Sequence, residues 1–211
     1  RGHRQGTGRW RRSRHRSRSE RRAGVAGSPG PFLLPYSLGK VTEPVFTHLD
    51  PLGRARMVDV TPKEPTHRRA VARCRVLMKP ETTVAIANRE MSKGDVLAVA
   101  RVAGIQAAKR TSDMIPLCHP LLIGAVSVNF DIGDDYIEIE VSVDTVDRTG
   151  VEMEALHACS VAALTIYDMC KSADRGMTIG EIALWEKTGG RSGTYRRAGN
   201  IAPTVTNVVE P

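Results

Sequence analysis

The chain is poor in aromatic residues and cysteine, and it has no long apolar run. Aromatic side chains make up 4% of the 211 residues, so the core must be built from Val, Ile, Leu, Ala and Met. No apolar run approaches the roughly 18 to 20 residues that span a bilayer, so we expect no transmembrane helix and no membrane partner. The 19 glycines and 12 prolines are ordinary numbers, which excludes a collagen-like or wholly disordered chain.

The four cysteines form no CxxC pair of the kind found in metal and redox sites; they are Cys74, Cys118, Cys159 and Cys170. A chain of this length does not need disulfides to stabilise its core. We therefore expect free thiols, no bound metal, and a cytoplasmic location, or a mitochondrial one if the source is eukaryotic.

The positive charge is concentrated at one end of the chain. The net charge is +8, yet residues 1–22 hold ten arginines against one acid. The remaining chain has 21 basic and 22 acidic residues and is nearly neutral. A folded domain that binds nucleic acid usually carries an excess of positive charge on its own surface. Because the remaining chain has no such excess, we expect no nucleic-acid partner.

Residues 1–46 are predicted to be a disordered Arg/Ser/Pro-rich extension and linker, because they contain too few apolar side chains to order themselves. The Arg- and Ser-rich composition also resembles a transit peptide, and a polyanion-binding segment is a third alternative. The folded domain is predicted over residues 47–197, with a flexible C-terminal tail over 198–211.

The predicted domain mixes strand and helix patterns. Alternating apolar and polar residues predict a strand over 70–78. Further strands are predicted over 55–60, 126–132, 136–146 and 177–185. Apolar residues three and four apart predict a helix over 93–112. A short helix is predicted over 81–90, after a proline, and the longest over 149–171, with Thr149 as its N-cap. A tight polar turn at 133–135 makes a hairpin, so the fold class is α+β.

A loop and a helix start concentrate polar residues. Leu117, Cys118 and His119 lie between two prolines, which present the histidine ring at a defined angle to a phosphate or a proton. The alternative is a packed loop histidine. Glu152 and Glu154 open the long helix, where the helix dipole alone favours acids, or where one of them contacts a ligand or acts as an acid or base.

The last turn of the same helix carries an acid and a lysine. Asp168 and Lys171 share a face, either as a surface ion pair worth less than ~1 kcal/mol or as an acid–base pair. Glu154 lies fourteen residues before Asp168, about 21 Å along the helix, so the two cannot touch one small reacting group. We therefore predict either a long ligand or an oligomer with composite sites.

Further cations come from two other segments. The glycine-rich loop over 187–193 carries Lys187 and Arg191 and suits an oligophosphate, although it lacks the GxxxxGK[ST] spacing. Lys93 and Lys109 belong to the earlier predicted helix.

At these residues the chain closely resembles the cyclic pyranopterin monophosphate synthases, the molybdenum cofactor biosynthesis protein C family. The matching stretches are MVDV (57–60), SKGDVL (92–97), AGIQAAKRTSDMIPLCHPL (103–121), TGVEMEALHACSVAALTIYDMCK (149–171) and KTGGRSG (187–193). The family usually has lysine where this chain has Arg191, which keeps the charge and changes the hydrogen-bonding geometry.

The resemblance implies a ferredoxin-like antiparallel sheet packed with long helices, assembled as a hexamer of three dimers with the active site at a subunit interface. It implies a lyase that converts 3′,8-cyclo-7,8-dihydroguanosine 5′-triphosphate to cyclic pyranopterin monophosphate with release of pyrophosphate. No redox change occurs in this reaction, and no nicotinamide, flavin or iron–sulfur motif is present, so we expect no cofactor.

The resemblance also assigns the residues. The catalytic acid falls on Asp168, with Lys171 beside it. The substrate-binding positions are Lys93, Leu117, Cys118, His119, Glu152, Met153, Glu154 and Lys187. Two rival hypotheses remain: a zinc-dependent purine ring-opening cyclohydrolase, and a nucleic-acid-binding module that uses the arginine-rich segment.

Overall fold

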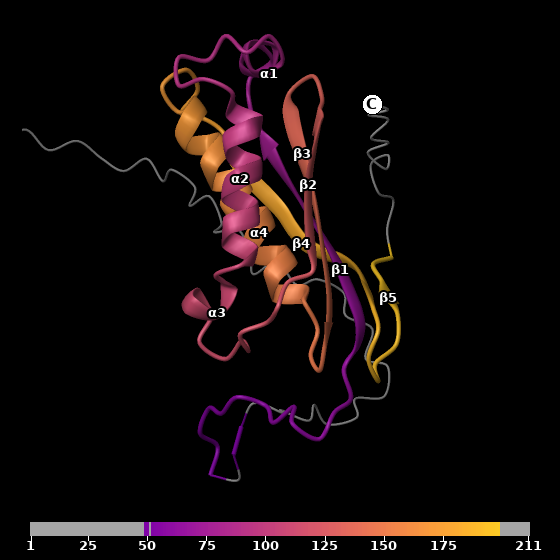
Figure 1. Cartoon of the computed structure of the whole chain (residues 1–211). Helices are drawn as coiled ribbons and strands as arrows, with labels where there is room; N and C mark the ends of the chain where they lie inside the picture. Colours follow the sequence, from indigo (N-terminus) through magenta and orange to yellow (C-terminus); the bar gives the residue numbers. More distant parts are fainter. Residues whose placement is uncertain (1–48, 51, 199–211) are drawn as a thin grey trace, which may run out of the picture. The chain divides into compact units, whose positions relative to one another are not determined.

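A five-stranded antiparallel sheet in the order β2-β3-β1-β4-β5 forms one layer of the computed structural model (Figure 1). The structure describes residues 49–50 and 52–198; the predictions for 1–46 and for the tail beyond 198 lie outside them. The strands are β1 Thr66–Leu77, β2 Ala125–Ile132, β3 Tyr136–Asp147, β4 Thr178–Thr188 and β5 Tyr195–Arg196. The helices are α1 Pro80–Ala87, α2 Val96–Ala108, α3 Thr111–Met114 and α4 Glu152–Cys170.

The predicted α+β class is confirmed. With the helices between β1 and β2 taken together, the elements follow the β-α-β-β-α-β order of ferredoxin-like folds, and β5 adds a short edge strand. None of the helices in the described part of the chain has the length and apolar character to span a bilayer.

Helices α2 and α4 cover one face of the sheet (Figure 1), because alternate strand residues turn apolar side chains toward them. Ala70, Ala72, Cys74 and Val76 of β1 are all buried in this core. The two helices approach closely at Gly104, where an added Cβ would lie 3.2 Å from the Ala158 carbonyl oxygen. This close packing fixes where the two ends of α4 lie relative to α2.

Several predicted boundaries are wrong for local reasons. Residues 55–60 are not a strand: only Ala55 forms an isolated bridge, with Leu49, because no neighbouring strand pairs with the segment. The helix predicted over 93–112 begins at Val96, after Gly94 with φ of +93° and the Asp95 cap, so Lys93 lies in the preceding turn. It also ends at Ala108, and α3 is a separate short helix.

The long helix also starts later than predicted. Its first residue is Glu152, and the N-cap position is Val151, which makes no side-chain cap hydrogen bond. Thr149 therefore does not cap the helix. It belongs instead to the turn between β3 and α4, where it lines a pocket.

Candidate active site

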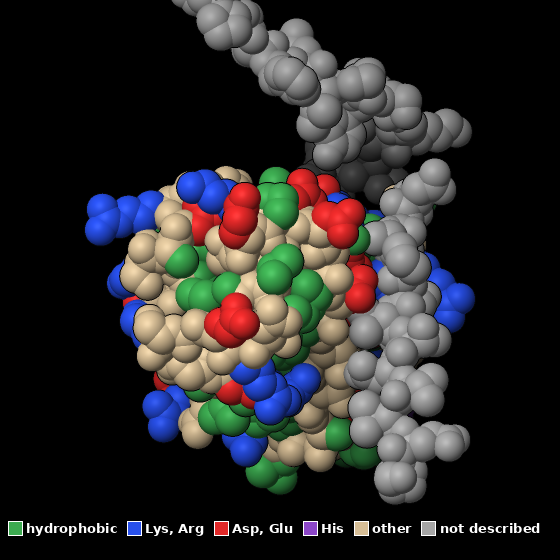
Figure 2. All heavy atoms as spheres, turned by 90° about the horizontal axis from the view of Figure 1, so that it is seen from above, with side chains coloured by type: hydrophobic (Ala, Val, Ile, Leu, Met, Phe, Trp, Pro, Cys, Tyr) green, Lys and Arg blue, Asp and Glu red, His purple; other side chains and the backbone are tan. Residues whose placement is uncertain are grey.

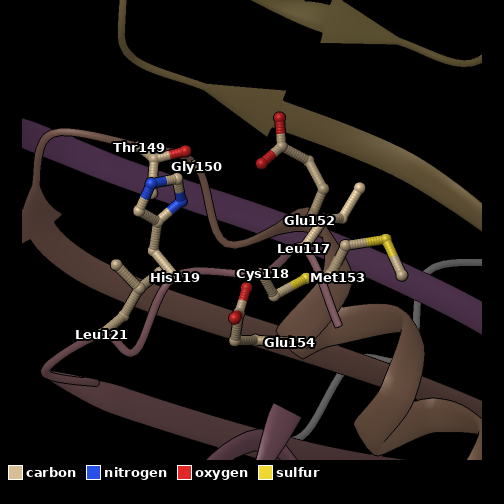
Figure 3. Close-up of a pocket in the computed structure, with 9 residues that line it drawn as sticks. All are labelled: Leu117, Cys118, His119, Leu121, Thr149, Gly150, Glu152, Met153 and Glu154. Carbon is tan, nitrogen blue, oxygen red and sulfur yellow. The ribbon is translucent and has the colours of Figure 1, made fainter. Parts of the chain in front are cut away.

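A pocket of about 210 Å³ lies where the chain enters α4 (Figure 3). Three segments line it: the loop before β2, the turn after β3 and the first turn of α4. The lining residues are Leu117, Cys118, His119, Leu121, Thr149, Gly150, Glu152, Met153 and Glu154. The structure thus brings together all six residues that the sequence pointed to in the 117–119 loop and at the helix start.

The His119 ring is held by the segment that was predicted to be a strand. Its Nε2 lies 2.8 Å from the carbonyl oxygen of Val58. Because a carbonyl oxygen can only accept, Nε2 must carry the proton and donate it. In the neutral ring this leaves an unprotonated Nδ1, which can accept a hydrogen bond or a proton from a ligand.

Glu154 is an almost buried carboxyl group, with 4% of its surface exposed. Burial raises its pKa to about 7, and the charge of Glu152 adds to the effect, although a backbone hydrogen bond at Glu154 opposes it. Burial, together with the charge of Glu154, also raises the pKa of the Cys118 thiol. Glu154 can therefore be a proton donor near neutral pH, whereas Cys118 stays a thiol.

Two cations flank the pocket. Lys187 of β4 places its Nζ 3.8 Å from a Glu152 carboxylate oxygen and also contacts the Ser192 hydroxyl. Arg68 donates to the carbonyl oxygen of Arg148 at 3.2 Å, next to the turn that holds Thr149. Sequence reasoning missed Arg68, because nothing in the sequence separates it from the neighbouring arginine on β1.

A second cluster lies at the other end of α4. Asp168 accepts from Lys171 Nζ at 2.6 Å and from Lys93 Nζ at 3.0 Å, and Lys93 also donates to the Asp168 carbonyl oxygen at 2.7 Å. Hydrogen bonds from Lys171 and then Lys93 lower the pKa of Asp168, so it stays a carboxylate at neutral pH. All three side chains are about half exposed, and Figure 2 shows charged and apolar side chains interspersed at this end of the molecule.

One chain does not bring the two clusters together. Glu154 and Asp168 are separated by fourteen residues of a continuous helix, about 21 Å. The pocket is also smaller than the ~300 to 1,000 Å³ that usually encloses a small-molecule ligand. Arg191 is exposed and is not among the pocket residues.

The described residues contain no group of three or more His, Cys, Asp or Glu side chains that could hold a metal ion. The site is instead built from carboxyl groups, one imidazole and amines, which suit proton transfer and the binding of an anionic ligand.

Fold and site define an α+β protein with a pocket lined by carboxyl, imidazole and thiol side chains at one end of its long helix and a lysine–aspartate cluster at the other. The sequence profile of the MoaC family matches residues 57–190, and the chain belongs to this family. It is 62% identical over 154 residues to the cyclic pyranopterin monophosphate synthase of Thermomicrobium roseum, covering 72% of this chain and 93% of the relative.

Two further relatives carry related names. Identity is 61% over 152 residues to the cyclic pyranopterin monophosphate synthase of Roseiflexus sp. (strain RS-1), covering 71% of this chain and 96% of the relative. Identity is 60% over 154 residues to cyclic pyranopterin monophosphate synthase 3 of Mycobacterium bovis, covering 72% of this chain and 87% of the relative.

Proposed function

We propose that the chain is a cyclic pyranopterin monophosphate synthase of molybdenum cofactor biosynthesis. It converts 3′,8-cyclo-7,8-dihydroguanosine 5′-triphosphate to cyclic pyranopterin monophosphate and pyrophosphate, as a phosphorus–oxygen lyase. The family match over residues 57–190, which contains all the catalytic and substrate-binding positions that the resemblance assigns, carries this proposal. The four thiols are free, which fits the reducing cytoplasm as the site of action.

The active site is composite, with the pocket of one copy facing the Asp168 cluster of another. Each cluster alone is incomplete, and their charges are complementary: carboxyl groups at the start of α4, and Lys93 and Lys171 at its end. Exposed Leu164 lies on α4 between the two ends and would be covered by a partner lying antiparallel to it. A hexamer of three dimers provides such contacts between copies.

The two clusters have different tasks in this composite site. The pocket holds the heterocycle, with Glu154 as the acid and His119 Nδ1 as the acceptor, while Lys93, Lys171 and Lys187 bind the triphosphate. Forming a cyclic monophosphate from a triphosphate requires a substrate hydroxyl to attack the α-phosphorus and to displace pyrophosphate. Asp168 remains ionised, so it can remove the proton from that hydroxyl as general base, with Lys171 orienting it.

The direct test of the activity is incubation of the purified full chain with the cyclic guanosine triphosphate. We expect pyrophosphate and an oxidisable pterin in equal amounts. Asp168→Asn should lose turnover while its circular dichroism and its assembly stay unchanged. A near-normal rate in Asp168→Asn would remove this residue from the mechanism.

Mixing inactive variants tests the composite site separately. Asp168→Asn damages one cluster and His119→Ala the other, so a mixed dimer contains one intact site. Random mixing of equal amounts should restore about a quarter of the wild-type sites. The matched control, Asp168→Asn mixed with Lys171→Ala, should stay inactive because both variants damage the same cluster. No recovery after proven subunit exchange would show that each site lies within one chain.

A further inference from the structure

A buried carboxyl group lies just beyond the end of α4, close in the chain to the Asp168 cluster. Asp174 is only 2% exposed, and both of its oxygens accept from backbone amides: Oδ2 from Lys79 at 2.8 Å and Oδ1 from Gly176 at 2.9 Å. These hydrogen bonds, that of Lys79 first, outweigh burial and lower the pKa of Asp174, so it is a carboxylate at neutral pH. Because burying a charge is costly, this is an unusual position for an aspartate.

The carboxylate joins the end of α4 to the start of α1. Asp174 is fixed to α4, because its own amide and that of Ala173 donate to the carbonyl oxygen of Cys170 at 3.0 and 2.9 Å. Lys79 is the N-cap residue of α1 and makes no side-chain cap hydrogen bond. The Asp174 carboxylate therefore lies at the N-terminal end of α1, where the helix dipole favours a negative charge (Figure 1).

The far end of α1 leads to Lys93. The turn after α1 is bonded to that helix, because the amides of Asn88, Arg89 and Glu90 all donate to carbonyl oxygens of its last turn. Lys93 lies in this turn and donates to both the carbonyl oxygen and the carboxylate of Asp168. Helix α1 and its turn therefore form one unit that contacts the end of α4 twice, through the buried carboxylate at its start and through the lysine amine beyond its end.

The Cys170 thiol shows that these two contacts are near each other. Burial raises the pKa of Cys170 to about 11, while the charge of Lys93 lowers it and the charge of Asp174 raises it. The effect of a charge on a pKa falls with distance, so both charges lie near the same buried sulfur. Asp174 is thus part of the surroundings of the Asp168 cluster.

We propose that Asp174 is a positioning residue that, through α1, sets where the Lys93 amine meets Asp168. Buried Ile86 and Met91 also hold α1 and its turn, but apolar packing is non-directional, whereas a charge-assisted hydrogen bond fixes an orientation. The 8 residues of α1 span ~12 Å, so a tilt of about 5° at its start moves its far end by about 1 Å. This inference rests on the proposed function, in which Asp168 is the general base.

Two substitutions break this tie from opposite sides. Asp174→Asn removes the charge and leaves one carbonyl oxygen where two oxygens accept. Lys79→Pro removes the N–H donor, and the φ of −69° at Lys79 is one that proline adopts. Lys79→Ala is the matched control, because it keeps the N–H and changes only an exposed side chain. Thr83→Val is a second control, since it removes a hydrogen bond from α1 to the carbonyl oxygen of Asp134 and leaves the contact with α4 intact.

The titration of Asp168, followed by ¹³C NMR of labelled aspartate, reports on the tie without any turnover. Hydrogen bonds from Lys171 and then Lys93 lower the pKa of Asp168, so displacing Lys93 should raise it. We expect this rise in Asp174→Asn, in Lys79→Pro and directly in Lys93→Met, and no further rise when Asp174→Asn is combined with Lys93→Met. Both controls should titrate as wild type does.

Turnover gives a second measurement. A misplacement of about 1 Å can cost about a hundredfold in rate, so kcat/KM should fall at least about tenfold in Asp174→Asn and in Lys79→Pro. The acid limb of its pH profile should move to higher pH together with the titration of Asp168. Lys79→Ala and Thr83→Val should keep both the rate and the profile.

Three results would overturn the proposal. The first is an Asp168 titration that is unchanged in both tie variants although Lys93→Met shifts it. The second is an equal shift in Thr83→Val, which would mean that any loosening of α1 has this effect. The third is failure of both tie variants to fold, which would mean that the tie serves the whole domain. Because the titration needs no substrate, its result stands even if wild type fails to turn over, which would refute the proposed function alone.

Discussion

Glu154 should make the stability of this protein fall as the pH rises toward neutrality. An acid whose pKa is raised in the folded state binds its proton more tightly there than in the unfolded chain. Between its ordinary value of 4.5 and the folded value of about 7, the folded state therefore holds more protons. The contribution of Glu154 to the free energy of unfolding is therefore most favourable below about pH 4.5, and it declines as the pH rises to about 7.

The size of the effect follows from the shift. Raising the pKa of Glu154 from 4.5 to about 7 lowers the free energy of unfolding at high pH by at most roughly 3 kcal/mol. Glu154→Gln removes the ionisation, so at pH 8 the variant should be more stable than wild type by up to ~3 kcal/mol. For a chain of this size the melting temperature would rise by about 6 to 12 °C. Below pH 4.5 the difference should disappear.

Urea unfolding at pH 4.5, 6, 7 and 8, with wild type and variant at one protein concentration, measures this directly. Glu152→Gln is the matched control, because Glu152 lies two residues before Glu154, is 32% exposed and faces Lys187. It should keep most of the pH slope. A Glu154→Gln variant with the same pH slope as wild type would refute burial as the cause.

Three further predictions use other parts of the structure. In neutral His119 the ¹⁵N shifts should show protonated Nε2 and bare Nδ1, because the Val58 carbonyl oxygen needs a donor; the opposite tautomer would refute this arrangement. Gly104→Ala should destabilise the protein by about 1 to 3 kcal/mol in urea unfolding, because the new Cβ would lie 3.2 Å from the backbone of α4. Gly180→Ala is the control and should change stability little, because the space around Gly180 is open. Equal effects of the two substitutions would contradict the packing argument. Removing residues 1–30 should leave turnover with the cyclic guanosine triphosphate unchanged, whereas a loss beyond tenfold would assign those residues a role in the reaction.

The sequence pattern predicted the paired strands and long helices because side-chain alternation and helical spacing directly record which face is buried. It failed at residues 55–60, where a strand-like pattern has no strand beside it. It also placed the start of α2 too early, because neither the positive φ of Gly94 nor the Asp95 cap changes the apolar spacing.

The sequence likewise predicted some features of the candidate site and missed others. Local clustering predicted the segments 117–119 and 152–154 and the Asp168–Lys171 pair, because the residues within each are close in sequence. Only the fold brings Lys93, 75 residues away, to Asp168. The sequence could not predict the hydrogen bond from His119 to Val58, because its acceptor is a backbone atom 61 residues away. The alternation over 70–78 places Arg73 and Arg75 on the polar side of a strand, and only the assembled sheet shows how little of the Arg73 side chain is exposed to solvent.

The pKa values of two of the three carboxyl groups on α4, Glu154 and Asp168, are shifted in opposite directions, which fits the proposed composite site. Burial raises the pKa of Glu154, so it can give up a proton near neutrality, while Lys171 and Lys93 lower that of Asp168, so it can accept one. A pair separated in this way can supply the acid and the base of one reaction. On a single copy they lie about 21 Å apart and cannot act on the same bond. In the proposed antiparallel assembly the acid end of one α4 would meet the base end of the other, so assembly, rather than the fold of one chain, would make the pair catalytic.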